Sequence, residues 1–221
     1  MSATKGLGTI LFLSCGIAVH AQSNTVQPNA IQPNDAAAIS DHVVDYSPIT
    51  PAERFHWIVD NTLGVRNLAA GVFTAAWGTM TDSPREYGPH WDGYAKRYFV
   101  RLADGSVSHT MEAGLGSLWG EDPRFFRAGS GQPFKSRLGH VMKTTFMTTN
   151  RNGEYMPAYA RYTAIVGTDF LANTWKPDSH ATTNHALLRI PISFVDRFVG
   201  HAFSEFWPDI RERVFKKRDS Q

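Results

Sequence analysis

Two histidine–glutamate pairs are the side chains best suited to chemistry in this sequence. His109 lies three residues before Glu112, and His201 lies four residues before Glu205, so each pair would share one face of a helix. A carboxylate beside an imidazole can position it for acid–base work. Four such groups meeting across two packed helices could instead bind zinc or another transition ion. One hypothesis is therefore a hydrolase or metal-binding enzyme that uses these four residues and a divalent metal cofactor.

The same pairs have a structural interpretation, which we favour. Buried polar groups need hydrogen-bond partners wherever they occur, and each pair could satisfy itself. The spacing also differs from the His-Glu-x-x-His of zinc peptidases and the Glu-x-x-His of di-iron bundles. After the predicted signal peptide, the chain contains no Gly-x-Ser-x-Gly, Ser-x-x-Lys or phosphate-cradling glycine motif. The sequence thus favours a non-catalytic protein without a cofactor.

A second group of candidate ligands follows the first histidine–glutamate pair. Glu121 and Asp122 are adjacent carboxylates that could bind a hard cation, and His140 is a further candidate metal ligand. The alternative is a helix end at which the two carboxylates pair with Arg124 or Arg127. Two neighbouring carboxylates without further ligands are a weak indication of a metal site, so we favour the helix end.

The first 21 residues have the pattern of a secretory signal peptide. Lys5 provides the positive start, residues 7–19 are predominantly apolar, and a small-residue cleavage site ends at Ala21. Lipoprotein processing at Cys15 is the alternative. Because this is the only cysteine, a processed chain would have no disulfide and no thiolate metal ligand. We expect an exported protein of the periplasm or cell envelope.

Composition divides the remaining chain into three parts. Residues 22–49 are rich in Gln, Asn, Pro and Ala and predict a disordered linker. Residues 50–215 have enough apolar content for one folded domain, and residues 216–221 form a basic tail. The formal net charge of +2 gives no general case for a nucleic-acid partner. The basic end is either a solvated terminus or a segment attracted to anionic lipid.

The folded part is predicted to be helical. Thr50 and Glu53 form a capping box with proline at the first helical position. Ala70, Thr74 and Gly78 form a ridge of small residues that would let another helix approach closely. Apolar spacing predicts helices over 55–63, 67–79, 134–148, 158–175 and 182–207. In the segment 134–148 we expect an inward-facing apolar row of Leu138, Val141, Met142 and Phe146, and in the segment 182–207 an apolar stripe of Ile192, Val195, Val199, Ala202 and Phe206.

The segment 91–119 allows two interpretations. Apolar and small residues recur at steps of three and four, which indicates one long helix. Asp104-Gly105, however, is also a turn signal between two potential strands, so residues 98–111 could form a hairpin. We favour the helix, because the residues beyond this turn show no strand alternation.

Three motifs resemble an uncharacterised family of exported bacterial proteins. The matching stretches are Trp91–Tyr98, Glu121–Phe125 and Glu205–Asp209. The resemblance covers most of the chain after Pro51. It implies export, but it carries no assigned activity, so no catalytic role transfers from it.

Together these patterns predict an all-α, compact bundle of five to seven helices with close Gly/Ala-rich packing, preceded by a signal peptide and a disordered arm. No stretch reaches 18 uncharged apolar residues, which argues against an ordinary membrane-spanning helix. Aromatic residues near helix ends fit either core packing or a membrane interface. The predicted function is a structural or interaction protein of the cell envelope, with a membrane surface or another envelope protein as its partner. The sequence leaves the oligomeric state open.

Overall fold

A computed structural model describes residues 46–216, with side chains described as far as Val214. The predicted signal peptide and most of the predicted linker and basic tail lie outside the described residues. The described part is all-α apart from one small sheet, as the sequence predicts. Its helices are α1 (Pro51–Leu63), α2 (Val65–Met80), α3 (Trp91–Trp119), α4 (Phe134–Phe146), α5 (Tyr159–Leu171) and α6 (Thr183–Lys216), with short 3-10 helices η1 (Arg85–Tyr87) and η2 (Ala172–Thr174).

Local sequence signals determine where several helices begin and end. The Thr50 hydroxyl accepts from the Glu53 backbone N–H, and the Glu53 carboxylate accepts from the Thr50 N–H, which completes the predicted capping box. Gly120 ends α3 with a φ of 78°, a left-handed conformation that glycine adopts without strain. The segment 91–119 is one continuous helix, so the helical interpretation is confirmed and Gly105 does not interrupt it.

A three-stranded antiparallel sheet was not predicted. It comprises β1 (Glu121–Asp122), β2 (Met147–Asn150) and β3 (Tyr155–Pro157), in the order β1-β2-β3. Strands of two to four residues are too short to show the alternation that identifies a strand in sequence. The sheet matters because it places the two adjacent carboxylates of β1 inside the molecule.

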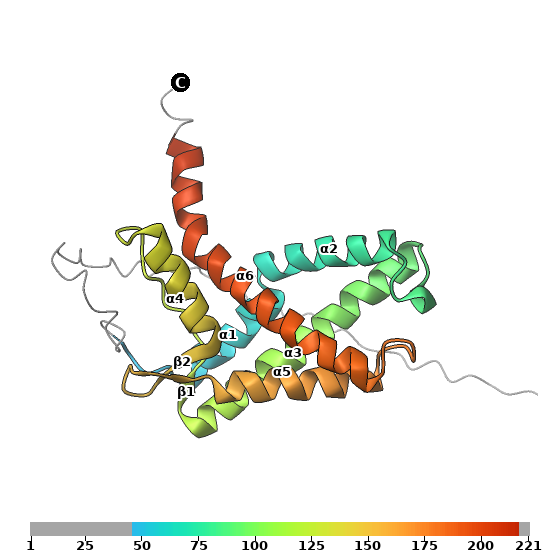
Figure 1. The fold of residues 1–221 in the computed structure, drawn as a ribbon, viewed down its shortest axis with the longest axis horizontal. Coiled ribbons are helices and arrows are strands. Elements are labelled where there is room, and N and C mark those ends of the chain that lie inside the picture. Colours follow the sequence, from blue (N-terminus) through green and yellow to red (C-terminus); the bar gives the residue numbers. More distant parts are fainter. Residues whose placement is uncertain (1–45, 217–221) are drawn as a thin grey trace, which may run out of the picture. The chain divides into compact units, whose positions relative to one another are not determined.

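The helix α3 makes the most extensive contacts with other helices (Figure 1). It packs most extensively against α5 and also contacts α2 and α1, whereas α6 packs against α4 and α5. The chain turns back between α2 and α3, so these two helices run side by side. Residues of α3, α4, α5 and α6 meet in one region of the domain.

Small residues allow the close contacts of α3. Ala113 on α3 and Ala164 on α5 are fully buried, and a side chain at Gly167 would collide with Met111 on α3. Gly71 on α2 likewise leaves room for the Tyr98 ring. Close Gly/Ala-rich packing is thus present, as predicted. It is confined to particular helix pairs, because Gly114, Gly139 and Gly200 have nothing within contact distance.

The interior contains few bulky apolar side chains. Of the nine hydrophobic residues that are buried in the described part of the chain, seven are alanines, and Val141 and Ile165 are the other two. Most of the expected apolar row of α4 is therefore outside: Leu138, Met142 and Phe146 are exposed, and only Val141 is buried. Ile192, Val195 and Val199 of α6 are exposed as well. The predicted rows are thus only partly correct: Val141 lies on the inner side of α4, and the exposed residues of α6 continue through Phe203 and Trp207 instead of Ala202 and Phe206. Spacing also did not identify the side on which each row would lie.

Among the described residues, none of the helices combines the length and the apolar character needed to cross a membrane.

Candidate functional site: buried ion pairs beneath an apolar exterior

The centre of the domain holds an ion cluster that links three helices. Glu112 on α3 accepts hydrogen bonds from Arg161 on α5, at 2.9 Å, and from Arg197 on α6. Arg161 also donates to the backbone carbonyls of Thr144 and Thr145 at 2.7 and 3.0 Å. Glu112 and Arg161 are each only 2% exposed. These residues form what we call the Glu112 cluster.

The arginines keep Glu112 ionised. Burial alone would raise its pKa, but the charges of Arg197 and Arg161 outweigh burial and hold the pKa below its ordinary value. A charge pair in such a site is costly to desolvate, and removing one partner leaves the other uncompensated. The cluster is therefore suited to holding three helices in one arrangement.

A second ion cluster joins α6 to α4 and to the loop between β1 and α4. Glu205 is completely buried and accepts from Arg137 on α4 at 2.7 Å. The same carboxylate accepts from the backbone N–H groups of Ala128 and Gly129 at 3.0 and 3.2 Å. Arg137 also pairs with Asp209, one turn further along α6. We call this arrangement the Glu205 cluster.

The two candidate histidines contact neutral groups instead of the candidate glutamates. His109 Nδ1 lies 3.2 Å from the Thr62 hydroxyl, and its ring packs edge-on against Trp57. His201 stacks on Phe125, and its Nδ1 lies 3.5 Å from the Thr144 hydroxyl. In each predicted pair, the histidine and the glutamate thus have different partners.

Burial keeps both imidazoles neutral. Desolvation, reinforced by the nearby Arg197, lowers the pKa of His109 to about 4. Desolvation, reinforced by Arg161 and Arg197, lowers the pKa of His201 to about 2. A general base works best with a pKa near the working pH, and both shifts move the imidazole pKa away from that range.

The second group of candidates is also divided among separate partners. The Glu121 carboxylate accepts from the backbone N–H of Ala160 at 3.1 Å, at the start of α5, where the helix dipole favours negative charge. Asp122 pairs with Arg124 at 2.7 Å. The His140 Nε2 lies 2.7 Å from a backbone carbonyl, that of residue 126.

Within the part of the chain that the structure describes, no three His, Cys, Asp or Glu side chains are grouped so that they could hold a metal ion.

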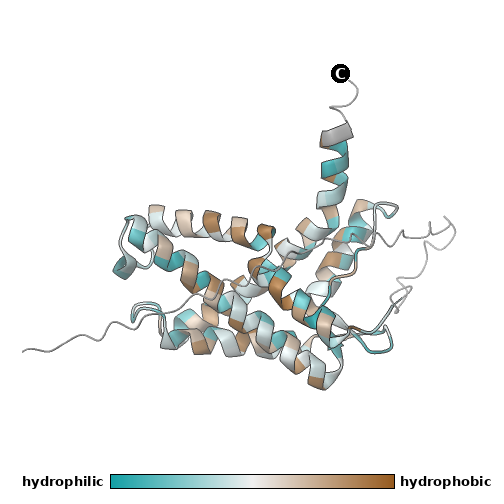
Figure 2. Cartoon of the chain, turned by 180° about the vertical axis from the view of Figure 1, so that it is seen from behind, coloured by the Kyte–Doolittle hydropathy of each residue, from teal (hydrophilic) through white to brown (hydrophobic). Residues whose placement is uncertain are grey.

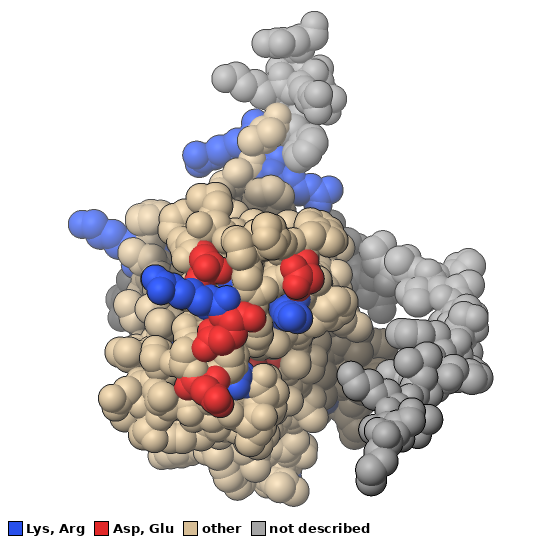
Figure 3. Space-filling view, turned by 90° about the vertical axis from the view of Figure 1, so that its right-hand side faces the viewer, with Lys and Arg blue, Asp and Glu red and all other residues tan. Residues whose placement is uncertain are grey.

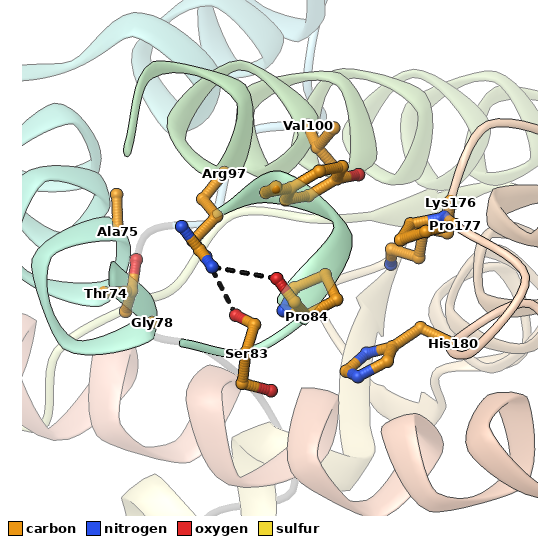
Figure 4. A pocket seen from close by; sticks show the side chains of 11 residues that line it. Thr74, Ala75, Gly78, Ser83, Pro84, Arg97, Val100, Lys176, Pro177 and His180 are labelled. Carbon is orange, nitrogen blue, oxygen red and sulfur yellow. Dashed lines mark hydrogen bonds between the residues drawn. The ribbon is translucent and has the colours of Figure 1, made fainter. Parts of the chain in front are cut away.

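One pocket lies between the end of α2, the start of α3 and the loop after η2 (Figure 4). It has a volume of about 190 Å³. Its Arg97 donates to the carbonyls of Ser83 and Pro84 at 2.9 and 2.8 Å, and its Lys176 pairs with Asp104 at 2.6 Å. The two lining cations therefore serve the fold, and Arg97 holds the loop between α2 and α3 in place.

A larger pocket, of about 570 Å³, lies between the segment before α1, α1 itself, the end of α3 and the sheet. Its two arginines donate to carbonyls. Arg54 donates to Ala113 and Glu121 at 3.2 and 2.9 Å, and Arg151 donates to Ser117 at 3.2 Å. Both arginines of this pocket are therefore engaged in hydrogen bonds that hold the fold together.

Large apolar side chains cover much of the exterior instead. Ile192 is 64% exposed, and Phe73 and Trp77 on α2 are exposed as well. Figure 2 shows hydrophobic residues recurring along α2, and hydrophilic residues in the connection that follows α2 and in the last turns of α6. Contact between so many large apolar side chains and water is unfavourable in free energy.

Exposed charges, in contrast, are concentrated near helix ends. In the described residues from 97 to 119 and from 159 to 171, no Asp, Glu, Lys or Arg is classed as exposed. Figure 3 looks towards the end where α2 passes into α3 and shows acidic and basic side chains gathered within otherwise uncharged surface. Arg85, Glu86, Asp92 and Lys96, which belong to that connection and the start of α3, are exposed.

Sequence reasoning missed the arginines that organise the interior. Arg161 is the one charged residue between Glu154 and Asp169, and a lone charge in such a context could have indicated a buried partner. Arg137 offered no such signal, because it lies in a helix with several basic residues. Its role depends on the neighbouring helix, which the sequence does not reveal.

No protein-family model matches this chain, and comparisons with curated proteins and with solved structures also gave no match.

Proposed function

We propose that this is an exported, non-catalytic protein of the cell envelope that acts in structure or interaction at a membrane surface. The observation that carries the proposal is the inverted distribution of side chains. Glu112, Arg161 and Glu205 are buried, whereas most large apolar residues of α2 and α6 are exposed. An apolar exterior gains free energy when it is removed from water, at about 25 cal/mol per Å².

The sequence supports the cellular location in this proposal. Its first 21 residues have the pattern of a signal peptide, and its three motifs resemble a family of exported proteins. A membrane would cover the apolar exterior without a specific protein partner. Another envelope protein remains the alternative partner, and it would need to cover several helices.

The rival enzyme hypothesis receives less support from the geometry. Glu112 and Glu205 are each bound by arginine, and His109 and His201 contact hydroxyl groups and aromatic rings. An enzyme built on these residues would have to break two buried ion clusters before its side chains could meet. Metal analysis of the purified protein, with and without His201→Ala, tests this alternative directly.

Co-sedimentation with vesicles tests the proposal itself. The purified protein is mixed with vesicles of phosphatidylethanolamine and phosphatidylglycerol and with vesicles of phosphatidylcholine alone. We expect it to pellet with the anionic vesicles, and less of it to do so at high salt, because salt screens the basic end. A protein that stays in the supernatant with both vesicle types at low salt would contradict the proposal.

A further inference from the structure

The two faces of α6 have opposite chemistry over most of its length. One face carries polar or charged residues at every fourth position, which we call the inner row: Arg189, Ser193, Arg197, His201, Glu205 and Asp209. The other face carries apolar residues at steps of three and four, which we call the outer stripe: Leu188, Ile192, Val195, Val199, Phe203, Trp207 and Ile210.

Side chains of the inner row bind other parts of the domain. Arg197 binds Glu112, and Glu205 binds Arg137, while Arg189 donates to the backbone carbonyl of His180 at 2.9 Å. These contacts fix the rotation of α6 about its own axis. Because the inner row must face α4 and α5, the outer stripe must face away from them.

The outer stripe is long and contains no charged residue of its own, although exposed Arg66 of α2 lies over the Phe203 ring, 5.9 Å from its centroid. From Leu188 to Ile210 it extends over roughly 33 Å at 1.5 Å per residue. Its members are between 42% and 64% exposed. Among the described residues of α6 up to Ile210, Asp196 is the one charged side chain classed as exposed.

Basic residues lie at one end of this stripe. Arg211 and Arg213 are exposed in the last turns of α6, on either side of exposed Glu212. Exposed Lys135 lies at the start of α4, where the neighbouring Phe134 ring packs against Phe206. An apolar face with cations at its end complements an anionic bilayer, in which acyl chains lie beneath charged headgroups.

We propose that the outer stripe of α6 is the surface that enters the acyl-chain layer of an anionic membrane, with the basic end of α6 at the headgroups. This inference rests on the proposed function and names the part of the protein that carries it out. A second copy of the chain fits the observations less well. One symmetric contact would cover one face, whereas α2 also exposes Val72, Phe73 and Trp77.

Site-specific quenching tests this placement. Cys15 is the only cysteine, so in a Cys15→Ser background a single new cysteine can be labelled with bimane. The test variant is Val199→Cys in the outer stripe, and the control is Asp178→Cys, an exposed position in the connection before α6. Vesicles contain phosphatidylethanolamine and phosphatidylglycerol, with or without bromine atoms on the acyl chains.

We expect brominated vesicles to remove most of the fluorescence at position 199 and little of it at position 178. The double substitution Ile192→Gln/Val199→Gln should lower the vesicle-bound to free ratio roughly tenfold, because two apolar side chains lose their gain on leaving water. The control Val166→Gln, which changes an exposed valine of α5, should bind as the unchanged protein does.

Each other outcome has a separate meaning. Binding to vesicles without quenching at position 199 overturns this inference and leaves the proposed function intact. A lipid-free dimer in which position 199 is protected from labelling and is cross-linked to its counterpart overturns the inference in favour of a second copy. Absence of binding to any vesicle overturns the proposed function and this inference together.

Discussion

The inner row and the outer stripe of α6 belong to one helix, yet they are held by different forces. The inner row is fixed by specific partners, such as Arg197 with Glu112 and Glu205 with Arg137. The outer stripe, which includes Val199, makes no comparable set of contacts and is largely exposed. Directional ion pairs therefore set the position of this helix, whereas its apolar side chains remain available for another environment.

The largest expected effect comes from breaking the Glu112 cluster. Glu112→Gln removes the charge that compensates Arg161 and Arg197, and we expect a loss of about 3–5 kcal/mol in the free energy of unfolding. Urea unfolding followed by circular dichroism measures it. The matched control, Asp196→Asn, changes an exposed acid of α6 and should stay within about 0.5 kcal/mol. Equal effects of the two substitutions would refute the contrast between the faces.

Breaking the Glu205 cluster should have a somewhat smaller effect. Glu205→Gln keeps one amide oxygen as an acceptor for the loop N–H groups but loses the charge opposite Arg137. We expect a loss of roughly 1.5–3 kcal/mol, the usual worth of hydrogen bonds to charged groups. Faster amide exchange at Ala128 and Gly129 should accompany it. Unchanged exchange at these two residues would argue against the described contacts.

Acidification should destabilise the fold through the partly buried His109 and the buried His201. Their folded-state pKa values, about 4 for His109 and about 2 for His201, lie below the ordinary value of 6.5. As the pH falls through 6.5, the unfolded chain therefore takes up protons that the folded chain does not. Between pH 7 and pH 5.5 each histidine should cost about 1 kcal/mol of stability.

Unfolding measured at pH 7 and at pH 5.5 checks the direction and the size of this effect. His201→Asn should remove about half of the change, whereas His56→Gln, at an exposed position of α1, should leave the change as it was. Stability that increases towards pH 5.5 would show that one or both imidazoles are charged in the folded protein.

The smallest expected effect comes from a substitution in the outer stripe. Val199→Thr replaces a methyl group by a hydroxyl in the outer stripe, and in water it should change stability by less than about 0.5 kcal/mol. The same substitution at Val141, which is fully buried, should cost about 1–3 kcal/mol. Thermal unfolding of the two variants in lipid-free buffer compares them. Matching losses would mean that the outer stripe is packed within the protein.

Local signals in the sequence were sufficient for the ends of several elements. The capping box at Thr50 and Glu53 and the stop at Gly120 depend on residues within one helical turn, so they can be recognised without the fold. The continuous helix from 91 to 119 followed from its spacing. The short strand at Glu121 and Asp122 could not be recognised, because two residues show no period and the residues they pair with lie 29 and 27 positions further on.

The candidate site divides in the same way. Sequence identified His109, Glu112, His201 and Glu205 as polar groups on helical faces, but it assigned them to one another. The structure gives the glutamates to Arg161, Arg197 and Arg137. Residues on distant helices compete for each charged group, and only the packed arrangement decides which of them comes within hydrogen-bond distance.

The sequence by itself determined the helical class, the helix caps and the two-sided pattern of α6, because each depends on neighbours within a few residues. The tertiary structure alone decided which side of that pattern faces the interior. Spacing is the same for a helix with its apolar face inward and for one with that face outward. The choice depends on whether buried charges find partners on other helices, as Glu112 does with Arg161 and Arg197.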